Sequence, residues 1–143
     1  MSQSAPMEPY EQGDNAVADF ARQSREFLDK GRGYLAAGDL HQASEKGWGA
    51  AAWMAKAVAE AQGWQYNRHD EFFAVMRQAQ DVSGDARLRN LRRAANELHG
   101  YYYTRRGFLH SDDIGQGLEE VAILLDILQP LTEPNGGGAG AES

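Results

Sequence analysis

The stretch from Tyr34 to Gly63 constrains the fold more than any other part of the chain. Its sequence, YLAAGDLHQASEKGWGAAAWMAKAVAEAQG, is rich in alanine and glycine and contains one Gly-Asp pair. Gly38 suits the left-handed backbone at a helix end, and Asp39 followed three residues later by Gln42 has the spacing of a capping box. This pattern predicts that the chain reverses there and continues as one long helix of small residues. Small residues let neighbouring backbones come close, so we expect this to be the central helix of a bundle.

Apolar side chains recur at spacings of three and four residues in five stretches, which is the pattern of amphipathic helices. The predicted buried positions are Val17, Phe20, Ala21, Phe27, Leu28, Tyr34 and Leu35 in the first helix; Leu40, Ala43, Gly47, Ala50, Ala51, Met54 and Val58 in the second, with Trp48, Ala52, Ala55 and Ala59 beside them; Phe72, Phe73, Val75, Met76 and Ala79 in a short third; Leu88, Leu91, Ala95, Leu98 and Tyr102 in the fourth; and Ile114, Leu118, Val121, Leu125 and Leu128 in the last. No stretch alternates as a strand would. We therefore predict an all-α fold, an up-and-down bundle of four main helices plus one short helix.

Two features of these helices bear on partners and surfaces. Ile123, Leu124 and Ile127 widen the apolar surface of the last helix, which indicates either deep burial or a partner. Glu45 and Lys46 fall away from the small-residue stripe of the second helix, so we expect them to be solvent-facing charges.

The chain has the length of one domain, with 143 residues. We predict a flexible N-terminal lead over residues 1–13, a helical bundle over residues 14–129 and a disordered glycine-rich tail over residues 130–143. The sequence has no cysteine, no basic and apolar leader, and no apolar run of the roughly 20 residues that cross a bilayer. We expect a soluble, cytoplasmic protein without a membrane partner.

Charge is distributed unevenly along the chain. The net charge of −7 argues against a general nucleic-acid binder, because such proteins present a basic face to phosphates. Residues 85–106 nevertheless contain 6 Lys and Arg against 2 Asp and Glu, which makes this segment +4, whereas residues 107–143 contain 0 against 7. The basic segment is either a solvated helix face that pairs with acidic neighbours or a contact surface for an anionic ligand.

The sequence resembles a known superfamily in two places. GDLHQASEKGWGAAAWMAKAVAE is similar to the second helix of the HEPN superfamily, in particular of its PaREP-type branch of small prokaryotic proteins, and NELHGYYYTRRGFLHSDDI resembles the pattern before the last helix of these relatives. The likeness covers roughly residues 20–129. Tetratricopeptide repeats also contain such helices, but the chain has no second copy at a period of 34 residues.

The resemblance implies a bundle that commonly forms a homodimer. Many HEPN proteins are metal-independent ribonucleases of toxin or defence systems, with an arginine separated from a histidine by four to six residues; others have lost that pair and bind nucleotides or a partner protein. A further interpretation of this chain is that it is a purely structural partner of another protein from the same operon. Here Arg105 and His110 have four residues between them. Departing from the family pattern, Arg105 is followed by Arg106.

A second group of candidate residues lies in the fourth helix. At about 100° per residue, Arg92, Asn96 and His99 share one face, which Tyr103 extends if the helix persists, and Arg89 lies beside it. Histidine could move the proton of a ribose hydroxyl and arginine could stabilise a charged phosphorane, so either group could support RNA cleavage.

The remaining chemistry is sparse. Four histidines show no paired ligand spacing, and there is no phosphate-binding glycine loop, so we expect neither a metal nor a cofactor. We therefore predict a HEPN-like, dimerising, non-catalytic binding or accessory module. Arg89, Arg92, Asn96, His99 and Tyr103 would contact a nucleotide or RNA. The alternative is an endoribonuclease that uses Arg105 and His110 or, less favoured, Arg92 and His99.

Overall fold

The structure is a computed structural model that describes residues 9–67, 71–102 and 109–133. Within these ranges all regular secondary structure is helical, short turns connect the helices, and no strand is formed. The helices are α1 (Pro9–Ala36), α2 (Leu40–Gln62), α3 (Phe72–Ser83), α4 (Leu88–Tyr102), α5 (Ser111–Leu128) and the short 3-10 helix η3 (Gln129–Thr132).

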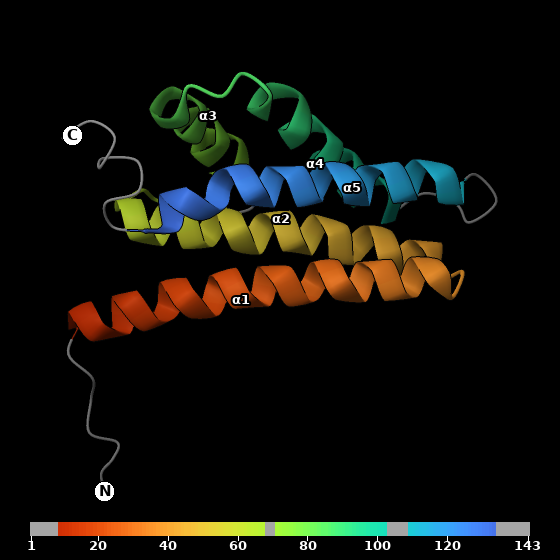
Figure 1. Ribbon diagram of the computed structural model, residues 1–143, viewed down its shortest axis with the longest axis horizontal. Helices are drawn as coiled ribbons and strands as arrows, with labels where there is room; N and C mark the ends of the chain where they lie inside the picture. The colour runs from red at the N-terminus through yellow and green to blue at the C-terminus, as the bar shows by residue number, and fades with distance from the viewer. Residues whose placement is uncertain (1–8, 68–70, 103–108, 134–143) are drawn as a thin grey trace, which may run out of the picture.

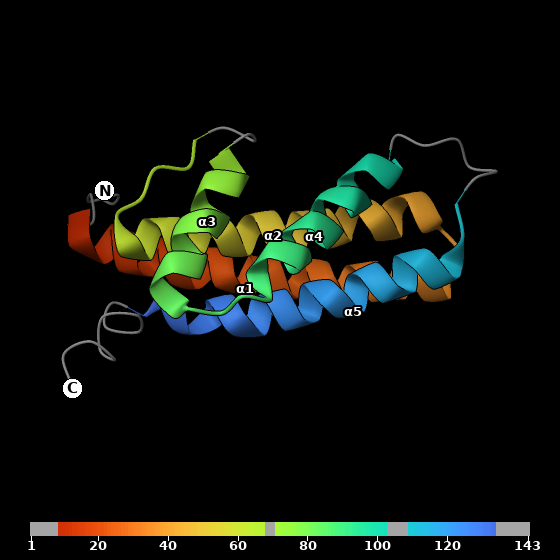
Figure 2. The same cartoon turned by 90° about the horizontal axis from the view of Figure 1, so that it is seen from above.

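Helix α2 is the centre of the molecule, as the sequence predicts. It packs against α1, α3, α4, α5 and η3. Helices α1, α2 and α5 run roughly along one direction, whereas α3 and α4 lie obliquely above α2 and α5, on the side away from α1 (Figures 1 and 2). The oblique α3–α4 pair distinguishes this arrangement from a simple set of aligned helices.

The turn between α1 and α2 has the predicted chemistry. Gly38 has a positive φ of 85°, and the side chain of Asp39 accepts a hydrogen bond of 3.1 Å from the backbone N–H of Gln42. The cap satisfies one of the free N–H groups at the start of α2, while the glycine lets the chain reverse without strain.

Glycines in α2 allow the close packing expected of this helix. A Cβ atom added at Gly47 would lie 2.6 Å from Leu118 of α5 and 2.8 Å from Leu98 of α4. One added at Gly49 would lie 2.5 Å from the ring of Phe27 in α1. Three helices therefore approach α2 at positions that only glycine leaves open.

Most of the predicted core is confirmed. The buried set includes Ala43, Gly47, Ala50, Ala51, Met54 and Val58 of α2, Leu88, Leu91, Ala95 and Leu98 of α4, and Ile114, Leu118, Val121, Leu125 and Leu128 of α5. Leu124 is also buried, which confirms burial as the explanation for part of the wide apolar surface of α5, whereas Ile123 is exposed and a partner at that position stays a prediction.

Two side-chain predictions were wrong. Tyr34 is exposed, because the buried line of α1 leads from Gly31, where a Cβ would lie 3.2 Å from Leu118, to the partly buried Leu35 and leaves Tyr34 at its edge. Lys46 is partly buried between α1 and α2, with its ammonium 4.8 Å from the ring centroid of Phe27, so it is not a free surface charge. Its neighbour Glu45, 3.6 Å away, is partly buried with it.

The helical region extends beyond the predicted bundle at both ends. Helix α1 begins at Pro9, so residues 9–13 of the predicted lead are helical. Residues 130–132 of the predicted tail belong to η3, whose Leu131 is only 3% exposed. The side-chain amide of Gln62 donates a 2.9 Å hydrogen bond to the carbonyl of Leu131, which fastens η3 to the end of α2.

None of the helices in the described part of the chain has an apolar stretch that could span a bilayer.

Candidate functional site

The basic segment begins at a tight turn before α4. Arg87 donates hydrogen bonds from Nε and Nη2 to the two carboxylate oxygens of Asp85, at 3.0 and 2.7 Å. These hydrogen bonds lower the pKa of Asp85. Arg87 is thus partly neutralised and is a weak candidate for contacting an external anion.

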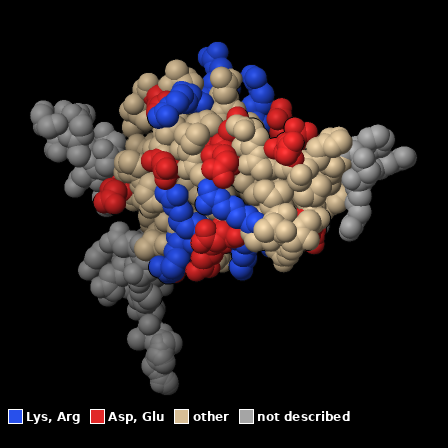
Figure 3. Space-filling view, turned by 45° about the vertical axis from the view of Figure 1, so that its right-hand side comes forward, with Lys and Arg blue, Asp and Glu red and all other residues tan. Residues whose placement is uncertain are grey.

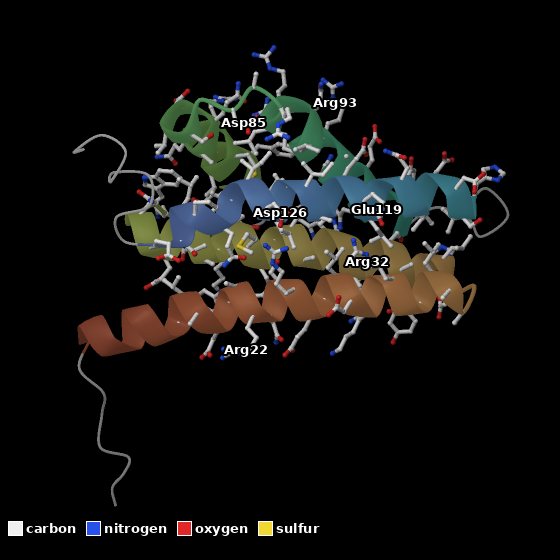
Figure 4. The ribbon with its side chains drawn as sticks, in the orientation of Figure 1. Arg22, Arg32, Asp85, Arg93, Glu119 and Asp126 are labelled. Atoms are coloured by element: carbon white, nitrogen blue, oxygen red, sulfur yellow. The ribbon has the colours of Figure 1, made fainter. Side chains whose placement is uncertain are left out.

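Arg89 and Arg93 form the open part of the basic face of α4. They are one helical turn apart and both are exposed. In the described part of the chain no carboxylate forms an ion pair with either of them. Figure 4 shows the Arg93 side chain projecting away from the rest of the bundle. These two guanidinium groups can therefore reach an anion in solution.

Arg92 occupies a different environment. It is half-buried, and its guanidinium carbon lies 5.9 Å from the ring centroid of Phe73 in α3. A guanidinium over an aromatic face is held by the ring quadrupole. Arg92 therefore braces α4 against α3 and is less exposed to a ligand than Arg89 and Arg93.

His99 faces the interior of the molecule more than the solvent. Its ring lies 4.9 Å, centroid to centroid, from that of Trp48 in α2, and its Nδ1 atom is buried. Trp48 in turn contacts the ring of Phe72 at 4.9 Å. Asn96, one turn before His99, is half-buried. The predicted face of Arg92, Asn96 and His99 is thus largely turned toward α2 and α3.

Acidic side chains surround the C-terminal end of α4. Burial, together with the carboxylates of Glu97, Asp113 and Glu120, raises the pKa of Tyr101. These carboxylates would repel a phosphate at this end, whereas the first half of the helix has its arginines. Among the described residues, the arginines of α4 thus lie in its N-terminal half and the carboxylates near its C-terminal end.

The other predicted group is described only in part. Arg105 and Tyr103 lie outside the described residues. His110 is exposed and directly precedes α5. The next two residues, Ser111 and Asp112, line an open cavity of about 560 Å³ between α1 and α5. The remaining lining residues are Arg32, Leu35, Gly115, Gln116, Leu118 and Glu119.

The predicted set of binding residues did not include the exposed Arg93, and the sequence did not indicate the aromatic contacts that support α4. Phe73 and Trp48 were predicted as core residues, and nothing in their spacing predicts that they contact Arg92 and His99. These contacts join residues of three helices, so helical periodicity could not predict them. The Asp85–Arg87 pair did have a signal, because an acid and a base two residues apart at a turn can close on each other.

Charges of both signs are mixed over the surface shown in Figure 3, rather than gathered in a single basic patch. Arg32 of α1 and Glu119 of α5, for example, approach to 3.6 Å. Among the described residues, no three His, Asp or Glu side chains are grouped so that they could hold a metal ion.

Comparison with known proteins supports the PaREP part of the resemblance and leaves the wider HEPN relationship a prediction. No curated protein and no solved structure matches the chain significantly. The model of the archaeal PaREP1/PaREP8 family matches residues 19–122, which include α2, α3, α4 and much of α1 and α5. The chain therefore belongs to the archaeal PaREP1/PaREP8 family.

Proposed function

We propose that the protein is a non-catalytic binding module of HEPN type, and that the N-terminal half of α4 contacts the phosphates of a nucleotide or RNA. The observation that supports this most directly is the exposure of Arg89 and Arg93 on one side of α4, without a carboxylate partner in the described residues. Guanidinium groups bind phosphate oxygens through paired hydrogen bonds, so two of them one turn apart suit adjacent phosphates.

The charge of the whole molecule limits how such binding can work. With a net charge of −7, the protein gains little long-range attraction for RNA, so affinity would depend on a few close contacts. Such binding would be confined to the arginines of α4 and would weaken as the salt concentration rises.

The proposal includes assembly with a second chain. We propose that the protein forms a homodimer. Such a dimer could also act as an accessory to a partner protein from the same operon. The proposed homodimer rests on the resemblance to HEPN proteins, and the exposed Ile123 on α5, beside the partly buried Ile127, is the position at which we place the contact.

The test is RNA binding by a charge-reversed variant. In a fluorescence polarisation titration with a labelled 20-nucleotide single-stranded RNA, Arg89→Glu/Arg93→Glu should weaken binding at least about tenfold. It should also reduce the slope of log K against log salt by about 1.4, because each contact contributes about 0.7. A labelled nucleotide titrated in parallel shows whether the shorter ligand suffices.

A matched control makes the same charge change elsewhere. Arg22→Glu/Arg32→Glu reverses two exposed arginines of α1, which in Figure 4 lies on the far side of the bundle from α4. If this control weakens binding as much as the α4 variant, only overall charge matters and the proposed surface is wrong.

The ribonuclease alternative is tested on the same RNA. His110 is exposed beside the cavity at the start of α5, which keeps this alternative open. Cleavage by the parent protein that is lost in His110→Ala, seen by gel electrophoresis, would replace the binding proposal by the catalytic one. Intact RNA after incubation with the parent protein supports the binding module.

A further inference from the structure

All three lysines of the chain lie over aromatic rings on the α1–α2 pair. Lys46 and Lys30 are 4.8 and 5.8 Å from the ring centroid of Phe27. Lys56 is 4.9 Å from that of Phe20 and 5.4 Å from that of Trp53. In an acidic protein this concentrates positive charge at one aromatic surface.

A cavity of about 360 Å³ opens at this surface, within the size range of small-ligand sites. It lies between α1, α2 and residues 66 and 67 of the segment that follows α2 (Figure 2). The lining residues are Phe27 of α1; Glu45, Trp48, Gly49, Ala52, Trp53 and Lys56 of α2; and Tyr66 and Asn67 of the following segment.

The aromatic walls are held in place by their own contacts. Trp53 packs against Phe20 and Phe27, with ring centroids 5.5 and 6.3 Å apart. Phe27 lies directly on Gly49, where a Cβ would come within 2.5 Å of the ring. Trp53 and Phe27 are therefore fixed and yet only half-buried, so both present ring surface to the cavity.

Polar groups of different kinds surround these rings. Lys56 is exposed at the cavity, and Glu45 lies 3.6 Å from the ammonium of Lys46. Burial and, to a lesser extent, the carboxylate of Glu71 raise the pKa of Tyr66 to about 12, so its hydroxyl stays a hydrogen-bond donor in neutral solution. Asn67 adds an exposed side-chain amide.

We propose that this cavity binds a flat aromatic anion of mononucleotide size. The ring would stack on the aromatic walls, because aromatic side chains bind bases through their faces. Its anionic group would contact Lys56, and the amide of Asn67 could hydrogen-bond the ring edge. A cationic aromatic ligand fits less well, because Lys46 and Lys56 already place ammonium groups over these rings.

This site is distinct from the arginines of α4. Its lining comes from α1, α2 and residues 66 and 67, and it includes no residue of α4. Its test therefore gives an answer whether or not Arg89 and Arg93 bind RNA.

The experiment is isothermal titration calorimetry of the full chain with adenosine 5′-monophosphate, adenosine and inorganic phosphate. We expect the monophosphate to bind more tightly than either part alone. Ala52→Leu should fill the cavity and weaken binding at least about tenfold. Lys56→Gln should weaken the binding of the monophosphate about tenfold and leave the affinity for adenosine unchanged.

Matched variants make the same changes outside the cavity. Ala18→Leu and Arg22→Gln alter exposed residues of α1 and should leave binding unchanged. If circular dichroism shows that Ala52→Leu does not fold, Lys56→Gln still tests the site, because it alters an exposed residue. A short single-stranded RNA, titrated in competition, shows whether the site takes a free nucleotide or one within a strand.

Several outcomes would overturn the inference. They are no heat of binding at about 1 mM monophosphate, equal binding of adenosine and the monophosphate, or equal losses in the matched variants. Loss of monophosphate binding in Arg89→Glu/Arg93→Glu but not in Lys56→Gln would place the nucleotide on α4 instead. That result would support the proposed function while removing this site.

Discussion

Two glycines show how the same residue type has opposite effects at different places. Gly47 lies where α2 meets α4 and α5, and a Cβ there would come within 2.6 Å of Leu118 and 2.8 Å of Leu98. Gly33 is helical and exposed in α1, and nothing lies within 4 Å of the position that its Cβ would take. The first is required by packing, whereas the second only weakens its helix.

Alanine substitution should therefore give opposite results at these two sites. Gly47→Ala should lower the free energy of unfolding by about 1–3 kcal/mol, because the added methyl group overpacks the core. Gly33→Ala should raise it by about 0.5–1 kcal/mol, because alanine has the better helix propensity and meets no neighbour. Urea unfolding followed by circular dichroism measures both. A stabilising Gly47→Ala would show that α2 does not pack as closely as described.

At the scale of elements, η3 ties three helices together at one end of the bundle. Arg25 of α1 donates hydrogen bonds of 3.2 and 2.9 Å to the side-chain oxygen of Gln129 and lies 3.2 Å from Asp126 of α5. Gln62 at the end of α2 bonds the backbone of Leu131. The short helix is thus part of the bundle, not of a tail.

Truncation should reveal this role. A chain that ends at Gln129 loses the buried Leu131 and the hydrogen bond from Gln62, which should lower the free energy of unfolding by about 2–3 kcal/mol. A chain that ends at Glu133 keeps these contacts and serves as the control. Equal melting temperatures of the two truncated chains would contradict a structural role for η3.

Helix α4 also shows how one element divides its residues between packing and solvent. Because α3 and α2 cover one of its sides, Arg92 and His99 contact aromatic rings, while Arg89 and Arg93 remain open. Among the described residues, the carboxylates around Tyr101 lie near the C-terminal end of α4, away from these open arginines.

At the scale of the whole molecule, the exposed apolar residue on α5 bears on assembly. Ile123 is 42% exposed beside the partly buried Ile127, although the rest of the apolar surface of α5 is largely covered. The proposed homodimer would cover this position.

Light scattering after gel filtration tests the assembly. We expect a mass of twice 15.8 kDa for the parent chain. Ile123→Lys should shift it toward the monomer, because a charge buried in an interface without a partner is costly. Val82→Lys alters a residue of α3 that is similarly exposed, at 44%, and should leave the mass unchanged. A parent chain that is monomeric at all concentrations would remove the dimer from the proposal.

Local chemistry was enough to predict much of this fold. The turn at Gly38 and Asp39, the small-residue helix α2 and the core stripes of α4 and α5 all follow from spacing along one helix, and each is present. The prediction failed where burial depends on another helix, as for Lys46 between α1 and α2 and for Leu131 beneath the end of the bundle.

The sequence by itself determined that residues 85–106 are basic and that its arginines and histidine repeat with a helical period. Only the tertiary structure decided which of them face solvent, because the oblique position of α3 places Phe73 under Arg92, and α2 places Trp48 beside His99. The same holds for the cavity at Trp53 and Tyr66, whose walls come from segments that are distant in sequence. Periodicity describes one helix at a time, whereas exposure and cavities depend on how helices cross.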